Sequence, residues 1–153
     1  MTRIVALGAG RMGRGIGHVF AYAGYRVDVL DFKARPAAEG AKLRAAALGE
    51  IGANLALLRD LGVLDEAQRH AILGRIRILP LEEAPAALAA ADFVFEGVTE
   101  TLEAKRDSFS RACVHLREDA IIASTTSSLN ADALAGLVWR LPRVGDSHSR
   151  LRP

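Results

Sequence analysis

The sequence predicts an α/β fold in which helices cover both faces of a doubly wound, mainly parallel sheet. Short apolar runs alternate along the chain with longer segments of helical periodicity, and the first run is followed at once by a glycine-rich turn. Apolar runs that are bounded by turns and separated by helices are typical of parallel strands buried on both faces. Half of the 153 residues are hydrophobic, which is enough for one main domain with a sizeable core.

The first three elements form a strand, a helix and a second strand. Residues 4–7 are apolar, and residues 12–23 carry apolar side chains at helical spacing before Gly24, a residue type that commonly ends helices. Residues 26–31 have the pattern of the second strand. Two strands joined by one helix are expected to be parallel neighbours.

A pair of helices is predicted next. Leucine and isoleucine recur at steps of three and four residues in a long helix that begins at Pro36 and ends at Gly62. Asp65 is the predicted N-cap of a second helix. The buried side of that helix is expected to carry Ile72, Leu73 and Ile76.

The rest of the predicted sheet follows this pair. Further strands are expected at residues 75–79, 92–96 and 120–123. Further helices are expected at residues 82–90 and 101–116. The polar run at residues 124–128 forms the loop after the last strand, where Ser127 or Ser128 can cap a helix over residues 131–137.

Composition excludes several classes of protein. The single cysteine, Cys113, cannot form an internal disulfide, which favours the reducing cytoplasm, and its apolar helix face indicates a core position. The first apolar run is too short for a signal peptide, and no apolar stretch approaches the roughly 20 residues of a membrane-spanning helix. We therefore expect a cytoplasmic protein with no membrane partner. No metal is expected, because the histidines on predicted helices lack the H-E-x-x-H spacing of a metal site. These histidines are His18, His70 and His115.

The glycine-rich turn predicts a dinucleotide site. Its sequence, Gly8-Ala9-Gly10-Arg11-Met12-Gly13, matches G-x-G-x-x-G between a predicted strand and a predicted helix. Gly8 permits the tight turn, Gly10 lets the backbone approach a pyrophosphate, and Gly13 lets the helix pack on the strand. The helix N-terminus offers N–H groups to the phosphates. Arg11 and Met12 belong to the same candidate cofactor site.

Asp31 completes this site at the end of the second strand, 18 residues after Gly13. A carboxylate there can accept hydrogen bonds from both ribose hydroxyls and repels a 2′-phosphate, so NAD is favoured over NADP although Lys33 and Arg35 lie nearby. Two other interpretations stay open. The glycines can serve a tight turn alone, and methyltransferases also combine a glycine loop with an acidic second-strand end.

Three stretches together resemble the 3-hydroxyacyl-CoA dehydrogenase family, in particular its N-terminal NAD-binding domain. They run in family order over residues 3–138: the glycine loop with Asp31, then Phe95-Glu96-Gly97-Val98-Thr99-Glu100-Thr101-Leu102-Glu103-Ala104-Lys105, then Ala123-Ser124-Thr125-Thr126-Ser127-Ser128-Leu129. The resemblance implies a Rossmann-type sheet, with the helical pair after the second strand as an insertion that helps to hold CoA. It also implies that the family's C-terminal helical domain is absent from this chain.

The resemblance assigns roles to four further residues. Glu100 matches a carboxylate beside the cofactor, and Lys105 matches a lysine near the cofactor and the CoA chain; without the family, both would be expected to be exposed at a helix start. Ser127 matches the serine that binds the substrate's 3-oxygen, while Thr125 stands where the family often has Asn. His148 lies about where the catalytic base belongs, 21 residues after Ser127, but lacks the Asn-Pro that follows it in the family.

The implied activity is oxidation of an L-3-hydroxyacyl-CoA to the 3-oxoacyl-CoA, with NAD as the hydride acceptor, in fatty-acid or hydroxybutyryl-CoA metabolism. Two alternatives remain: a non-catalytic NAD-binding fragment, and a related dehydrogenase that acts on a free 3-hydroxyacid or sugar acid. The expected partner is an acyl-CoA substrate. A sheet whose last strands are missing also predicts self-association into a homo-oligomer.

Positive charge gathers near the C-terminus. The net charge is +2, and residues 139–153 contain four Arg against one Asp, so the remaining chain is close to neutral. A neutral body lacks the clustered basic face that binds nucleic acid, and no such partner is expected. We assign residues 1–138 to the NAD-binding domain and interpret residues 139–153 as a divergent basic tail, truncated or frame-shifted.

Overall fold

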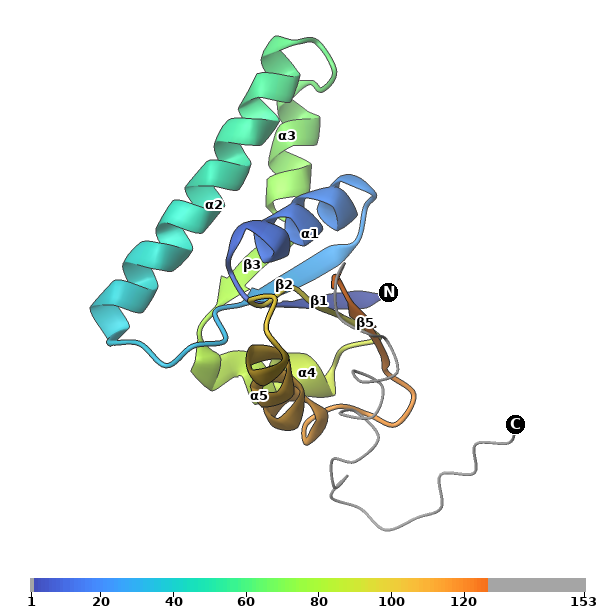
Figure 1. Cartoon of the computed structure of the whole chain (residues 1–153). Helices are drawn as coiled ribbons and strands as arrows, with labels where there is room; N and C mark the ends of the chain where they lie inside the picture. The colour runs from blue at the N-terminus through green and yellow to red at the C-terminus, as the bar shows by residue number, and fades with distance from the viewer. Residues whose placement is uncertain (1, 127–153) are drawn as a thin grey trace.

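Five parallel strands with helices on both faces make up residues 2–126, the part of the chain that the structure, a computed structural model, describes (Figure 1). The strands are β1 (Arg3–Leu7), β2 (Arg26–Leu30), β3 (Ile76–Leu79), β4 (Phe93–Glu96) and β5 (Ile121–Ser124). The helices are α1 (Arg11–Tyr22), α2 (Ala37–Asp60), α3 (Glu66–Leu73), α4 (Ala84–Ala89) and α5 (Leu102–Cys113), with a 3₁₀ turn at Leu81–Glu83.

The strand order is β3-β2-β1-β4-β5, which confirms the predicted doubly wound sheet. In the central strand, Val5 faces Asp28 of β2 on one side and Val94 of β4 on the other. The chain moves outward from β1 to β3 and then returns to the other side of β1. The order therefore reverses between β1 and β4, and open sheets of this kind bind ligands at the carboxyl ends of the two strands where the order reverses.

Two hydrophobic cores cover the two faces of the sheet. Alternate residues of the strands face α1, α2 and α3, where Val29 packs with Ile16 and Ile51. The intervening residues face α4 and α5, where Val94 packs with Leu88. Because both faces are buried, the strands need apolar residues at almost every position, which explains the short apolar runs of the sequence.

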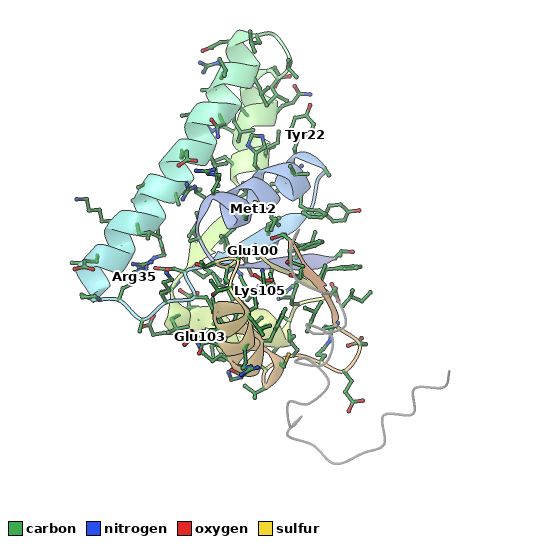
Figure 2. All side chains as sticks on the ribbon, viewed as in Figure 1. Met12, Tyr22, Arg35, Glu100, Glu103 and Lys105 are labelled. Atoms are coloured by element: carbon green, nitrogen blue, oxygen red, sulfur yellow. The ribbon has the colours of Figure 1, made fainter. Side chains whose placement is uncertain are left out.

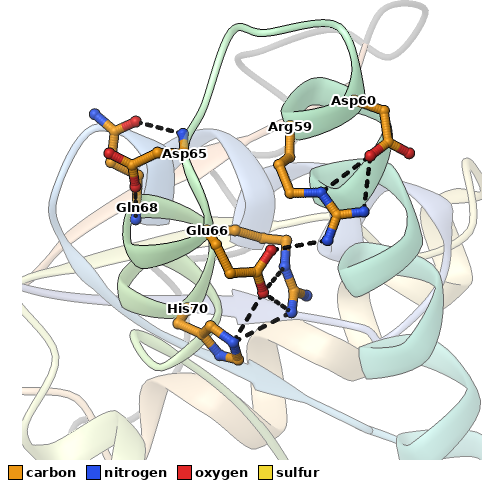
Figure 3. Close-up of polar contacts among 7 residues, drawn as sticks. Arg59, Asp60, Asp65, Glu66, Gln68 and His70 are labelled. Atoms are coloured by element: carbon orange, nitrogen blue, oxygen red, sulfur yellow. Dashed lines mark hydrogen bonds and ion pairs between the residues drawn. The ribbon is translucent and has the colours of Figure 1, made fainter.

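The predicted helical pair is confirmed as α2 and α3, which lie side by side and extend beyond the edge of the sheet (Figure 1). Asp65 is the N-cap of α3, and its carboxylate accepts a hydrogen bond of 2.7 Å from the Gln68 backbone. The Gln68 side chain accepts one of 2.8 Å from the Asp65 backbone, which completes a capping box (Figure 3). Arg59 at the end of α2 contacts Glu66 of α3 at 2.8 Å, so an ion pair joins the two helices.

Two predicted boundaries are wrong. Ile76 does not belong to the helix before it, because that helix ends before Gly74 and Ile76 begins β3 opposite Val27. The helix predicted at residues 101–116 extends only to Cys113, because Leu116 donates its N–H to the Cys113 carbonyl, three residues back. His115 therefore lies in the turn after α5 and not on the helix.

Cys113 is buried, as its apolar helix face predicts. No helix within residues 2–126 combines the length and the apolar character needed to cross a membrane. Ser127, Ser128, the expected helix at residues 131–137, His148 and the basic tail lie outside the described residues.

The charge network at the tip of α2 and α3 predicts acid-dependent stability. Hydrogen bonds from Arg69 and then Arg59 lower the pKa of Glu66 from its usual 4.5 to about 2. A carboxyl group whose pKa is lower in the folded than in the unfolded protein stabilises the fold at every pH above its unfolded-state pKa. That contribution is lost as the pH falls from 4.5 towards 2. We expect Glu66→Gln to have a lower Tm than the wild type at pH 6, with the difference shrinking as the pH falls below 4.5.

Circular dichroism melts between pH 6 and pH 3 measure this effect. The control is Glu118→Gln, which removes an exposed carboxylate from the loop before β5. Equal pH dependence in the wild type and Glu66→Gln would contradict the prediction.

Candidate functional site

The glycine turn brings α1 into direct contact with the end of β1. Gly8 has φ +99°, a left-handed conformation that strongly favours glycine, and donates its N–H to the Leu30 carbonyl at 3.0 Å. A Cβ on Gly13 would lie 1.7 Å from the carbonyl oxygen of Gly8. No other residue fits at position 13 unless α1 moves away from the turn.

Gly10 is the N-cap of α1 and leaves the helix N-terminus accessible. No side chain caps the first turn, and a Cβ on Gly10 would meet nothing within 4 Å. The first N–H groups of a helix without a side-chain cap favour an anion, and the missing Cβ leaves room for it.

A cleft of about 440 Å³ opens in front of this turn, at the carboxyl ends of β1, β2 and β4. Five of the predicted cofactor residues line it: Gly8, Gly10, Arg11, Met12 and Asp31. The loop between β4 and α5 forms another part of its wall with Gly97, Val98 and Thr99. Three predicted residues are not among the residues that line it: Gly13, Glu100 and Lys105.

The loops after β1 and β4 touch at the point where the strand order reverses. A Cβ on Gly97 would lie 3.1 Å from the Met12 Cβ, so the small size of this residue allows the close approach. Gly97 donates its N–H to the Leu7 carbonyl at 3.1 Å, which continues the pairing of β4 with β1. The cleft therefore lies where this class of sheet binds its ligands.

Asp31 lies at the edge of the cleft and is only 4% exposed. The Nε of Arg35 contacts both of its carboxylate oxygens, at 3.1 Å and 3.0 Å. A carboxylate has about four acceptor positions, so Asp31 keeps acceptor capacity for ligand hydroxyls. Arg35 also fixes its direction, a contact that the sequence did not reveal. Figure 2 shows Arg35 near the start of α2.

Arg111 covers Phe32, and both residues line the cleft; the sequence did not reveal this contact either. Its guanidinium lies 4.2 Å from the centre of the Phe32 ring, and it donates a hydrogen bond of 2.9 Å to the Phe32 carbonyl. A cation over an aromatic face stabilises the pair. Because α5 and β2 are far apart in sequence, no local pattern predicts this contact.

Arg14 brings one further donor to the cleft. It pairs with Glu50 of α2 at 3.1 Å and donates to the Ala9 carbonyl at 3.0 Å. Among the described residues, its Nε is the one buried side-chain polar atom without a hydrogen-bond partner. A buried donor without a partner is costly.

Beside the cleft, Glu100 and Lys105 lie close together (Figure 2) and form a cluster with Glu96, a residue to which the sequence pattern gave no role. Glu96 and Lys105 are both fully buried, whereas the Glu100 side chain is 37% exposed. Lys105 is thus not the exposed residue that its helix start alone suggests. The feature of the sequence that could have pointed to Glu96 is its position as an acidic residue at the end of an apolar strand.

Lys105 stays positively charged in this cluster. Burial is the largest single influence and lowers its pKa, but hydrogen bonds with Glu96 and then Glu100, together with their charges, raise the pKa above its usual value. The Nζ of Lys105 lies 2.8 Å from Glu96 and 3.0 Å from Glu100. A fully buried ammonium group is thus neutralised by one buried and one partly exposed carboxylate.

The strand order, the glycine turn and the carboxylate that follows β2 together define a dinucleotide-binding protein of the Rossmann type. A family model described as the NAD-binding domain of 3-hydroxyacyl-CoA dehydrogenase matches residues 3–149. The chain belongs to this family, and its cofactor is NAD.

Similar proteins carry closely related names. The 3-hydroxybutyryl-CoA dehydrogenase of Bradyrhizobium diazoefficiens is 35% identical over 148 residues, which cover 97% of this chain and 47% of that protein. A probable 3-hydroxybutyryl-CoA dehydrogenase of Bacillus subtilis is 32% identical over 149 residues, covering 97% and 48%. The chain thus spans about half the length of the curated relatives it matches.

Solved structures agree with this similarity. The (S)-3-hydroxybutyryl-CoA dehydrogenase PaaH1 from Ralstonia eutropha superposes with a TM-score of 0.80 at 27% identity, over 92% of this chain and 46% of that one. FadB2 from M. tuberculosis gives a TM-score of 0.77 at 28% identity, over 90% and 45%.

The contact between Gly13 and Gly8 gives a test of the site's framework. Gly13→Ala should lower the free energy of unfolding by on the order of 3 kcal/mol, because the new Cβ collides with the backbone. The control is Gly15→Ala in the same helix, where a Cβ meets nothing within 4 Å. This control should be neutral or stabilising by up to about 1 kcal/mol. Urea unfolding measures both, and equal stability of the two variants would contradict the packing described.

Proposed function

We propose that this chain supplies the NAD-binding half of an enzyme that oxidises L-3-hydroxyacyl-CoA to 3-oxoacyl-CoA. The observation that carries the proposal is a cleft, lined by the glycine turn and Asp31, at the strand-order reversal of a sheet that belongs to this family. The similar proteins from Bradyrhizobium diazoefficiens and Bacillus subtilis are named 3-hydroxybutyryl-CoA dehydrogenases, which supports a short-chain acyl-CoA as substrate.

The residues of the cleft fit a dinucleotide. The open N-terminus of α1 at Gly10 and the guanidinium group of Arg14, a residue that lines the cleft, are donors for pyrophosphate oxygens. Asp31 accepts hydrogen bonds from the adenosine ribose, in the direction that Arg35 fixes. Bound NAD supplies the hydride acceptor; the protein supplies position and electrostatics.

The remaining predicted residues complete the proposed site. Met12 and Arg11 line the cleft at the start of α1, and Glu100 and Lys105 lie beside it at the start of α5. Ser127 holds the substrate's 3-oxygen and His148 removes the hydroxyl proton in this proposal, as the resemblance implies. A base of this kind also needs an orienting partner.

The metabolic role, the cellular location and the oligomeric state of the chain belong to the same proposal. Fatty-acid or hydroxybutyryl-CoA metabolism in the cytoplasm follows from the names of the relatives and the single buried cysteine, Cys113. Self-association follows from β5, which lies at the edge of the described sheet and leaves Ile121 54% exposed.

A binding module without turnover is the second candidate function. The described residues form a dinucleotide cleft by themselves, and the chain spans 47% of the Bradyrhizobium diazoefficiens protein. Calorimetric titration with NADH, beside an assay of acetoacetyl-CoA reduction by NADH, separates the two. Turnover contradicts the module, binding without turnover contradicts catalysis by this chain alone, and the absence of binding contradicts both.

The same assay tests the acyl-CoA substrate class. A dehydrogenase for acyl-CoA should prefer acetoacetyl-CoA over acetoacetate at equal concentration. Equal KM values for the two would indicate a dehydrogenase for free 3-hydroxyacids.

Asp31 gives a sharper prediction about the cofactor. Asp31→Asn should weaken NADH binding about tenfold, because hydrogen bonds to a charged acceptor contribute about 1.5–3 kcal/mol. It should also narrow the preference for NADH over NADPH, since Lys33 and Arg35 remain at the cleft while the repelling charge is lost. Calorimetric Kd values for both cofactors measure the change.

The matched control is Asp28→Asn. Asp28 lies on β2, the strand that Asp31 follows, and is bound by an arginine, Arg77, at 2.7 Å, but it is not among the residues of the cleft. Its Kd values should match the wild type. An unchanged NADH affinity in Asp31→Asn would show that the ribose does not bind this carboxylate.

A further inference from the structure

Glu96 is a fully buried carboxylate at the carboxyl end of β4, beside the cleft. Four hydrogen bonds from three residues converge on it. The Nζ of Lys105 contacts its two oxygens at 3.0 Å and 2.8 Å, the Val98 backbone N–H donates at 2.8 Å, and the Ser124 hydroxyl donates at 2.6 Å. Glu96 is thus fully satisfied as an anion.

These contacts connect Glu96 to the loop after its own strand and to the end of the neighbouring strand β5. Val98 belongs to the loop that forms a wall of the cleft. Ser124 is the last residue of β5, three residues before Ser127. Because one rigid carboxylate holds the loop after β4 and the end of β5, their relative position depends on it.

Lys105 extends the connection to the surface. Its Nζ lies 3.0 Å from Glu100, and Glu100 also accepts a hydrogen bond from the Thr126 hydroxyl. Thr101 caps α5 and accepts a 3.2 Å hydrogen bond from the Ala104 backbone, so the helix start that carries Lys105 is fixed as well. The partly exposed Glu100 is therefore held in one direction by a fully buried pair.

Stability alone does not explain this arrangement. Burying two charges costs several kcal/mol per ion before pairing, and a well-packed apolar pair is often equally stable or better. A helix-to-strand link would also need only Glu96 and Lys105, whereas this cluster adds Glu100 at the rim and Ser124 on the next strand. Strongly coupled charges at the edge where ligands bind favour a functional role.

We propose that Glu96 is a positioning residue for the cofactor site: through Lys105 it sets the direction of Glu100, and through Val98 and Ser124 it fixes the loop that lines the cleft relative to the end of β5. The inference rests on the proposed function, because Glu100 must act on bound NAD for its direction to matter. Glu96 itself is buried and acts only through the residues that it holds.

The test compares NADH affinity with stability in four variants of the chain. Glu96→Gln keeps the shape of the side chain and removes its charge. The double variant Glu96→Gln with Lys105→Met removes both buried charges, and Glu100→Gln changes only the rim. Glu103→Gln is the control, since Glu103 is exposed on the first turn of α5. Titration calorimetry gives the Kd for NADH, and thermal melts give the Tm.

If Glu96 is a positioning residue, the variants should change the affinity for NADH and the Tm independently of each other. Glu96→Gln should lower the Tm and weaken NADH binding at least fivefold. The double variant should regain much of the Tm, because no buried charge is left alone, while NADH binding stays at least fivefold weaker. Glu100→Gln should weaken binding to a similar degree at wild-type Tm, and Glu103→Gln should match the wild type in both measurements.

A coupling measurement completes the test. Glu100→Gln added to the double variant should cause little further loss, because Glu100 has already lost its support. Full additivity, wild-type affinity in Glu100→Gln, or recovery of affinity together with Tm in the double variant would each overturn the inference. These outcomes leave the proposed function standing if the wild type binds NADH. A wild type that binds no NADH overturns both.

Discussion

The contact between Gly13 of α1 and Gly8 at the end of β1 is the constraint on which the site depends. A Cβ on Gly13 would lie 1.7 Å from the backbone carbonyl oxygen of Gly8, so α1 can start here only if position 13 lacks a side chain. Position 8 favours glycine for a different reason, its φ of +99°. That contact directs the open N-terminus of α1 across the carboxyl ends of the strands. The cofactor cleft is therefore a result of backbone packing, and the polar side chains are added to it.

A second constraint acts on the other side of the cleft. Gly97 allows the loop after β4 to touch Met12, and the carboxylate of Glu96 immediately before it is tied to Lys105. One side of the site is thus shaped by close backbone contact and the other by a buried ion pair. Both lie at the strands where the sheet reverses its order, which places cofactor residues from distant parts of the sequence together.

Local patterns in the sequence predicted the succession of strands and helices along the chain, the tight turn at Gly8 and the close packing of Gly13, because hydrophobic period and positive φ are set by neighbouring residues. The N-cap at Asp65 was predicted in the same way, from an N-cap residue before a helical period, whereas the capping box that Gln68 completes was not predicted. Ile76 was misplaced because a buried isoleucine continues a helical period and also begins a buried strand.

Contacts between distant segments could not be predicted from the sequence. The stacking of Arg111 on Phe32 required α5 to pack beside the turn that follows β2. The pairing of Asp31 with Arg35 spans only four residues but depends on the shape of that same turn, which no helical or strand period predicts. The burial of Lys105 was equally hidden, since a lysine in the first turn of a helix is usually exposed, and only a carboxylate from the end of β4 makes its burial possible. The family resemblance indicated that Lys105 has a role near the cofactor, but it did not indicate that the side chain is buried against Glu96.

The most direct test of the account is a titration of the ¹⁵N-labelled chain with NADH, followed by amide chemical shifts. The account predicts that the largest shifts fall on the glycine turn, on Asp31 and on the loop from Gly97 to Thr99, while the capped tip of α2 and α3 around Asp65 stays unchanged. Shifts centred on that tip, or no shifts at saturating NADH, would contradict it.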